Sequence, residues 1–486
     1  MTFKNAVKNT QIEARTENGM KTYDSSLSAC VDLFFAIGAS RGKDITSKFE
    51  RAFQEDAEIA SKILCWSRDV RGGAGERQIF RDMLVDIETN HSDYLEPLMK
   101  VAPEIGRWDD LLVLKTAKGK ALAFDMIGAA LHSGDGLAAK WMPRKGDNAV
   151  ALRKHLGWSP KQYRKTLVGL TKVVETQMCA KEWNDINFSH VPSLASSRYQ
   201  TAFHRNANDV YQTYKDNLAK DDGSAKVNAS AVYPYDVLKP LIKGGYGQSV
   251  DTTNKEVIQA QWNSLPNYIG DELILPMVDV SGSMHCPAGN SNSQLSCLDV
   301  AVSLGLYMAD KNVGPFQDMF LTFSTNAKIE VLGGDIVAKV RQLQNANWDM
   351  STDLNKAFDA VLAAGTKNNL AAEDMPTYIL VLSDMEFNSS QSSGWPHSED
   401  ITQYDESAIE MIERKYAVAG YTVPKLVFWN LNARSQDNVP VRFDKQGTAL
   451  ISGFSPAIMQ SILKAEDFTP KSIMLQTVNV SRYDIF

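Results

Sequence analysis

Long apolar runs and paired cysteines are both missing from this sequence of 486 residues. No stretch approaches the ~18 uninterrupted apolar residues that a membrane span needs, and the mixed polar segment from Met1 to Gly19 contains no apolar run of the kind found in secretion signals. The five cysteines are scattered and form no Cys-x-x-Cys pair, which indicates reduced thiols instead of a disulfide framework. We therefore expect an unexported, cytoplasmic protein without a membrane segment.

The composition is that of a folded protein. Hydrophobic residues make up 44% of the chain and charged residues 22%, values that exclude a disordered chain and allow large cores. Because domains usually contain ~100–200 residues, this length predicts more than one of them.

The charge is unevenly distributed along the chain. Residues 1–270 carry a net charge of +4 and residues 271–486 a net charge of -11, which together give the total of -7. Between Lys140 and Lys172 nine basic residues face a single acidic residue, Asp147. This stretch predicts either a basic surface for an acidic partner or the solvated faces of two helices. The candidate contacts for such a partner are Lys140, Arg144, Lys145, Lys161, Arg164 and Lys165.

The first half of the chain has the periodicity of helices. The segment from Ser47 to Glu50 has the pattern of a capping box, and Ser159-Pro160 places a capping residue before a proline suited to a first helical turn. Helix follows helix with short connections, which favours stacked helical pairs. We expect an all-α module over residues 1–265.

The second half alternates apolar runs with helical patterns. The runs are Leu273–Val280, Met319–Phe323, Tyr378–Leu382 and Leu426–Trp429. Strands that alternate with helices predict an α/β domain with a doubly wound, mostly parallel sheet over residues 266–486. The segment Phe320–Leu332 is expected to form a hairpin that adds one antiparallel edge strand.

One loop of this domain combines hard oxygen donors. Asp279, Ser281 and Ser283 follow the first predicted strand, at the end where such sheets bind ligands. A carboxylate and two hydroxyls suit Mg²⁺, or another divalent cation such as Mn²⁺ or Ca²⁺. Two later loops, Ser351-Thr352-Asp353 and Ser383-Asp384, could supply outer ligands. The loops offer no paired nucleophile and base, so we expect a binding site and not an enzyme.

In order and context these three segments resemble the metal-ion-dependent adhesion site of von Willebrand factor A domains. The resemblance assigns the metal to Asp279, Ser281, Ser283 and Thr352, with Asp384 as the second carboxylate. It also implies that an acidic group from a protein partner completes the coordination. The same pattern arises by chance as a turn with capping serines, which is the alternative interpretation.

The two halves together resemble the Ro ribonucleoprotein family, in which a ring of HEAT-like helical repeats, the TROVE module, precedes an A domain. Gly157-Trp158-Ser159-Pro160-Lys161 is similar to a helix start of TROVE modules. Other segments resemble an uncharacterised Ro-like family of plants, fungi and phages: Arg68–Arg77, Gly106–Asp110, Lys140–Arg144, Phe428–Asn430 and Arg482-Tyr483. The resemblance implies RNA binding by the helical module, with Trp141, Trp158 and Tyr163 available to stack on bases.

Other interpretations stay open at this point. The chain could be a protein-interaction scaffold that uses the metal loop to capture a carboxylate, and a metal-assisted hydrolase is disfavoured by the ligand types. The glycine-rich segment from Arg71 to Arg77 lacks the Gly-Lys-Ser/Thr ending of a phosphate loop. Its arginines, with Arg68, are expected to pair with Asp69, Glu76 or Asp82 in preference to RNA. His285 and Cys286 could bind zinc but have no second pair at ligand spacing.

Overall fold

The computed structural model describes residues 13–220, 222–228, 232–242, 250–289, 295–323, 327–344, 353–388, 406–433 and 438–485. The chain forms two compact units. Unit 1 contains residues 1–63, 233–252 and 266–480, and unit 2 contains residues 64–232, 253–265 and 481–486. Neither unit is continuous in sequence, unlike the predicted ranges 1–265 and 266–486. Within the described ranges, no helix has the length and apolar character required to span a lipid bilayer.

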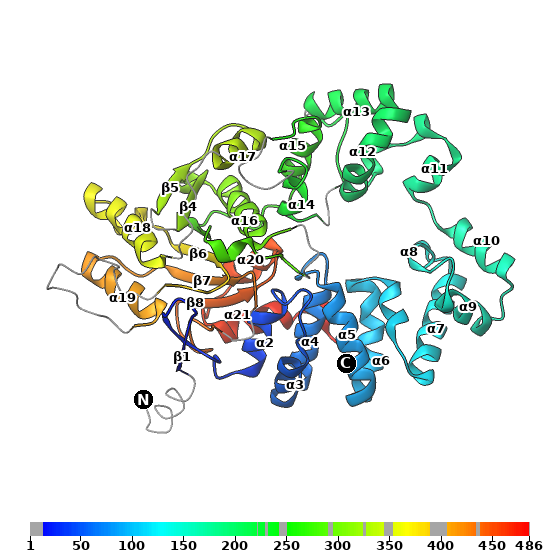
Figure 1. Ribbon diagram of the computed structural model, residues 1–486, viewed down its shortest axis with the longest axis horizontal. Helices are drawn as coiled ribbons and strands as arrows, with labels where there is room; N and C mark the ends of the chain where they lie inside the picture. The colour runs from blue at the N-terminus through cyan, green and yellow to red at the C-terminus, as the bar shows by residue number, and fades with distance from the viewer. Residues whose placement is uncertain are drawn as a thin grey trace. The chain divides into compact units, whose positions relative to one another are not determined.

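Unit 1 is built on a six-stranded sheet in the order β5-β4-β3-β6-β7-β8 (Figure 1). Its strands are β3 (Ile274–Asp279), β4 (Met319–Phe323), β5 (Lys328–Val331), β6 (Tyr378–Ser383), β7 (Lys425–Asn430) and β8 (Thr448–Ser452). All neighbours are parallel except β4 and β5, which pair antiparallel. The predicted mostly parallel sheet with one antiparallel edge strand is confirmed. Strand β3 is buried along its whole length, as expected for a central strand of such a sheet.

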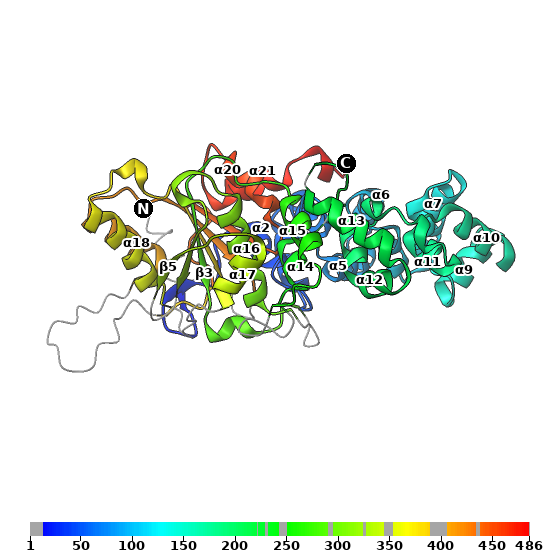
Figure 2. The ribbon, with the colours of Figure 1, turned by 90° about the horizontal axis from the view of Figure 1, so that it is seen from above.

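Helices connect and cover these strands. They are α16 (Cys297–Lys311), α17 (Ile336–Gln344), α18 (Leu354–Asn368), α19 (Ala408–Ala419), α20 (Met459–Leu463) and α21 (Pro470–Val478). Helix α16 packs on β3, and α18 packs on β4, β5 and α19. Figure 2 shows α16 next to β3. The helix–strand alternation that the sequence predicted is therefore the framework of this unit.

The N-terminal segment also belongs to unit 1. Its elements are β1 (Glu13–Arg15), β2 (Lys21–Tyr23), α2 (Ala29–Ile37) and α3 (Thr46–Glu55), joined later in the chain by α14 (Pro234–Leu238). Helix α2 packs on β8, where the Ser452 hydroxyl donates to the Phe34 carbonyl at 2.6 Å. A Cβ on Gly38 would lie 2.8 Å from the backbone of Gly453, so glycine permits this close approach.

Unit 2 is helical. The boundary between the two units, at residues 63 and 64, falls inside helix α4 (Ala57–Arg68). The later elements of unit 2 are α5 (Arg77–Asn90), α6 (Ser92–Ile105), η1 (Trp108–Val113), α7 (Ala117–His132), α8 (Gly136–Trp141), α9 (Asp147–His155), α10 (Pro160–Leu170), α11 (Val174–Ala180), α12 (Ser193–Asn206), α13 (Asn208–Lys220) and α15 (Lys255–Asn263). Successive helices pack in pairs, such as α5 with α6 and α12 with α13. The helical character is confirmed, and the arrangement as HEAT-like repeats in a ring stays a prediction.

Local capping was predicted with mixed success. Helix α10 begins as expected, with the Ser159 hydroxyl accepting from the Gln162 amide at 3.2 Å and Pro160 in the first turn. The capping box at Ser47 is wrong, because α3 already begins at Thr46 and has no side-chain cap on its preceding residue. Asp44 instead accepts from the Thr46 amide at 2.9 Å.

Candidate functional site: a carboxylate pair and a basic surface

The register of the sheet brings two of the three predicted metal loops together. Val278 on β3 lies opposite Leu382 on β6, and the two strands run parallel. Their carboxyl ends therefore meet at one edge, so that Asp279 and Ser383 become neighbours although 104 residues separate them. This edge is where doubly wound sheets bind ligands.

Asp279 is held by both loops. Its carboxylate accepts from the Ser281 amide at 2.9 Å within its own loop and from the Ser383 hydroxyl at 2.6 Å across the sheet. The hydroxyls of Ser281 and Ser283 lie 3.0 Å apart. Asp279 and Ser281 are buried and Ser283 is partly exposed, so solvent reaches this group of oxygens on the Ser283 side.

A second carboxylate, Asp384, is buried at the same edge. Burial, and then the negative charge of Asp384, raise the pKa of Asp279 to about 7. Two carboxylates and two hydroxyls are hard donors, and a divalent cation between them would offset the repulsion that raises this pKa. The residues present therefore fit Mg²⁺ in their chemistry.

The remaining predicted ligand, Thr352, lies outside the described residues. Its neighbour Asp353 caps α18 by accepting from the Lys356 amide at 3.0 Å, and it forms an ion pair with the Lys356 side chain at 3.6 Å. The predicted helix start at Leu354 is thus confirmed, and Asp353 has a structural role there.

Sequence reasoning missed two features beside the carboxylate pair. Ser383 was recognised only as part of a loop, and its hydrogen bond to Asp279 depends on strand order. A pocket next to Asp384 is lined by Asp32 of α2 and by three amide side chains, Asn430, Asn432 and Asn438. Asn430 ends β7 opposite Ser383 of the parallel strand β6, so it lies at the same edge, whereas Asp32 reaches it because α2 belongs to this unit.

The six predicted RNA contacts are all exposed side chains of unit 2. On α10, Lys161, Arg164 and Lys165 occupy one face, opposite the buried Tyr163 and Leu167. Helix α8, which ends near Lys140, packs against α10. None of the six forms an ion pair with a carboxylate in the described part of the chain; Arg144 donates to the Thr171 hydroxyl at 3.0 Å. Their charges are therefore available to an anion.

Two of the three predicted stacking residues are not available. Trp158 is buried against His132 at a ring distance of 5.2 Å, and Tyr163 is buried with its hydroxyl donating to the Pro143 carbonyl at 3.0 Å. Both are anchors of the core, because large amphipathic rings bury their apolar body and pair their polar end. Trp141 is partly exposed, and the Arg107 guanidinium lies 3.8 Å from its ring centre.

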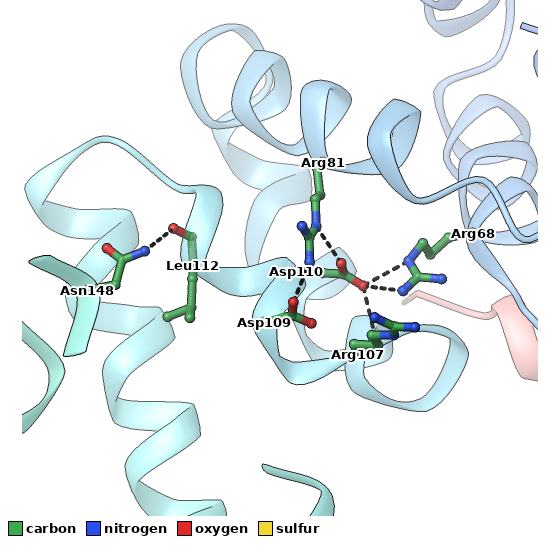
Figure 3. A network of polar contacts seen from close by, with 7 residues as sticks. All are labelled: Arg68, Arg81, Arg107, Asp109, Asp110, Leu112 and Asn148. Atoms are coloured by element: carbon green, nitrogen blue, oxygen red, sulfur yellow. Dashed lines mark hydrogen bonds and ion pairs between the residues drawn. The ribbon is translucent and has the colours of Figure 1, made fainter. Parts of the chain in front are cut away.

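The arginines around the glycine-rich segment pair differently from the prediction. Arg68 bonds to Asp110 and not to Asp69, and Asp69 receives the Arg71 amide and the Arg482 side chain. The pairs Arg68–Asp110 and Arg482–Asp69 could not be predicted, because the partners are far apart in the sequence. Figure 3 shows Arg68 and Arg81 converging on Asp110.

The cysteine next to the metal loop has a partner that the sequence did not suggest. Cys286 lies with its sulfur 3.5 Å from that of Cys297, at the start of α16. An isolated antiparallel bridge between Pro287 and Ser296 closes the intervening loop. In the described ranges His285 and Cys286 join no group of three or more His, Cys, Asp or Glu ligands, so zinc binding there stays without support.

Comparisons with known proteins relate both halves to families. The family model described as Domain of unknown function (DUF2828) matches residues 16–100 and 122–272, and the one described as Domain of unknown function (DUF7788) matches residues 274–482. An uncharacterized protein of Acanthamoeba polyphaga mimivirus is 29% identical over 523 residues, which cover 95% of this chain and 86% of that protein. The crystal structure of the Deinococcus radiodurans Ro (RSR) protein aligns with a TM-score of 0.44 and 14% identity, covering 93% of this chain and 99% of that one.

Proposed function

We propose that this protein binds RNA through the basic surface of α8 and α10. The observation that carries the proposal is the group of six exposed cations without carboxylate partners in the described part of the chain. When such cations neutralise phosphates, the counterions condensed on the nucleic acid are released, which makes binding favourable and dependent on salt. The resemblance of the sequence to the Ro family points to the same ligand class.

The test compares two triple variants by fluorescence polarisation with a labelled single-stranded RNA and a labelled hairpin. Changing Lys161, Arg164 and Lys165 to Glu is expected to weaken binding by more than about tenfold and to reduce the salt slope by about 2, since each phosphate contact contributes ~0.7 for single strands. The control changes the exposed Lys115, Lys118 and Lys120 of the α7 region to Glu, with the same change of net charge. If both variants lose RNA affinity equally, binding is not localised to the basic surface of α8 and α10, and the proposal is contradicted.

The carboxylate pair supports a second function, a Mg²⁺-dependent site of the A-domain type in unit 1. Asp279, Asp384, Ser281 and Ser283 would hold the cation, with Thr352 as the fifth protein ligand from the sequence. The cation supplies a positive centre that an acidic group from a partner can complete. The chain's own residues orient the site: Ser383 and the Ser281 amide fix the Asp279 carboxylate.

Calorimetric titration with Mg²⁺, Mn²⁺ and Ca²⁺ tests this site directly. Asp279→Ala should abolish binding, whereas Asp374→Asn, an exposed carboxylate of the same unit, should leave it unchanged. If Asp279→Ala also leaves RNA binding intact while a protein partner is lost, the protein functions as a scaffold through this site. Unchanged metal affinity in Asp279→Ala would refute the assignment.

A further inference from the structure

The four arginines at the junction of α4, α5 and η1 form a cluster that its carboxylates only half neutralise. These are Arg68, Arg77, Arg81 and Arg107, and the carboxylates that face them are Asp109 and Asp110. Neither the proposed RNA surface nor the metal site includes any of them. The cluster lies within unit 2.

Both carboxylates are occupied by two of the arginines (Figure 3). Asp110, fully buried, accepts from Arg68 Nε at 2.8 Å and from Arg81 Nε at 2.7 Å. Arg81 Nη2 donates to Asp109 at 2.8 Å. Asp110 also accepts from the backbone amide of Arg107 at 3.0 Å, which places that residue at the rim of the buried pairs.

The other two guanidinium groups have no carboxylate partner in the described part of the chain. Arg77 lies one helical turn before Arg81 on α5, so its side chain shares the face that meets η1. The Arg107 guanidinium carbon lies over the Trp141 ring, 3.8 Å from the ring centre. Arg77 is exposed and Arg107 partly exposed, so a solute can reach both.

The electrostatics agree with an excess of positive charge. Burial, and then the charge of Arg77, lower the pKa of Arg107 to about 10. Burial and the charges of Arg68 and Arg81 lower the pKa of Arg77. Burial and neighbouring cations both disfavour the charged guanidinium form, so an anion placed beside Arg77 and Arg107 would be stabilising.

We infer that Arg77 and Arg107, positioned by the Arg81–Asp110–Arg68 network, form a binding site for a phosphate monoester. Two unpaired guanidinium groups balance the two negative charges of such a group, and their planar forks match its oxygens bidentately. Arg107 is kept rigid by Trp141, which reduces the entropy lost on binding. The group could belong to a free nucleotide or to the phosphorylated end of a nucleic acid.

Calorimetry with defined probes tests the site and separates these sources. Adenosine 5′-monophosphate is compared with adenosine, and a short oligoribonucleotide with a 5′-phosphate is compared with its 5′-hydroxyl form. Binding that requires the phosphate is expected. Tight binding of the nucleotide alone assigns the site to free nucleotides, and a phosphate preference seen only in the oligonucleotide assigns it to an RNA end. No phosphate preference with any probe overturns the proposal.

Variants then locate the binding. Arg77→Gln and Arg107→Gln should each weaken phosphate-dependent binding by about tenfold or more, while Arg107→Lys should retain part of it through its charge. Arg205→Gln removes an exposed arginine of α12 in the same unit and should have no effect. The glutamate triple variant of α10 should also leave nucleotide binding unchanged, so failure here is distinct from failure of the RNA surface. Equal affinities in all arginine variants would overturn the site.

Discussion

The phenol of Tyr483 donates a 3.0 Å hydrogen bond to the buried carboxylate of Asp69, 414 residues earlier in the chain. Arg482 donates to both oxygens of the same carboxylate, and the Arg71 amide donates to one of them. The terminal turn of the chain is therefore part of the polar framework of unit 2.

Stability should depend on this contact in a characteristic pH range. Burial by itself would raise the pKa of Asp69, but the hydrogen bonds from Arg482, the Arg71 amide and Tyr483 outweigh it and lower the pKa. A lowered folded-state pKa gives stability that is present above the ordinary pKa of about 4 and is lost as the pH falls through the folded value. In urea denaturation Tyr483→Phe should lower the free energy of unfolding by about 1–2 kcal/mol at pH 7. In Asp69→Asn the free energy of unfolding should fall less steeply as the pH drops below about 4. A fall as steep as in the wild type would contradict the role of this carboxylate.

Asp110 should matter more for stability than Asp109. Asp110 is fully buried between Arg68 and Arg81, and removing it would leave the buried Arg68 charge without compensation. We expect Asp110→Ala to reduce the free energy of unfolding by about 3–5 kcal/mol, as for other broken buried pairs. Asp109 is a quarter exposed and, among the described residues, pairs with Arg81 alone, so Asp109→Ala should reduce the free energy of unfolding by about 1 kcal/mol. Chemical denaturation of both variants measures the difference. Equal losses of unfolding free energy would contradict the larger role of Asp110.

The metal-free protein should lose stability as the pH rises. Because the pKa of Asp279 is raised in the folded state, its contribution to stability is complete below about pH 4 and is lost through about pH 7. Mg²⁺ binds the ionised form, so it should raise Tm more at pH 8 than at pH 5. Thermal denaturation with and without Mg²⁺ measures this. In Asp279→Asn the Mg²⁺-induced rise in Tm should be the same at pH 8 and pH 5. If the rise still differs between the two pH values, another group causes the difference.

Cys286 and Cys297 should form a disulfide under mild oxidation. Their sulfurs lie 3.5 Å apart, and the Cys297 amide donates to the Cys286 carbonyl at 3.0 Å, which aligns the two backbones. With oxidised glutathione, the two thiols should be oxidised to an Sγ–Sγ bond. Their two protons and two electrons pass to the glutathione disulfide, which is reduced to two thiols. Mass spectrometry of the linked peptides detects the bond. Cys297→Ser should instead leave glutathione attached to Cys286, and attachment there in the wild type as well would disprove pairing.

The order of the strands explains how much of the candidate site was predictable. Asp279 lies at the end of one apolar run and Asp384 just beyond another, both runs were predicted to be strands, and the carboxyl ends of parallel strands share an edge. Strand β8 was missed because its five residues begin with Thr and end with Ser, which blurs the apolar signal. Asp32 was missed for another reason, since nothing in a helix such as α2 indicates which sheet it covers.

For the basic surface, too, the residue pattern predicted one part of the result and the packing of the helices decided the rest. The stretch from Lys140 to Lys172 predicted either a basic surface or the solvated faces of two helices, and Lys161, Arg164 and Lys165 are exposed on one face of α10. Trp158 and Tyr163 were expected to stack on bases but are buried, because spacing along a helix does not state which neighbouring helices cover it. Arg77 was expected to pair with a nearby carboxylate, but in the described part of the chain Arg77 and Arg107 have no carboxylate partner, because Asp109 and Asp110 are bound by other arginines.

By itself the sequence determined strands β3, β4, β6 and β7 and the helical character of unit 2, and it placed the oxygen donors at strand ends, because periodicity and local turn chemistry act over a few residues. Only the tertiary structure decided which carboxylate each arginine meets, that α2 joins the sheet and that Tyr483 returns to Asp69. Those choices depend on contacts between residues that are tens to hundreds of positions apart, and charge and shape must agree in three dimensions before such contacts are favourable.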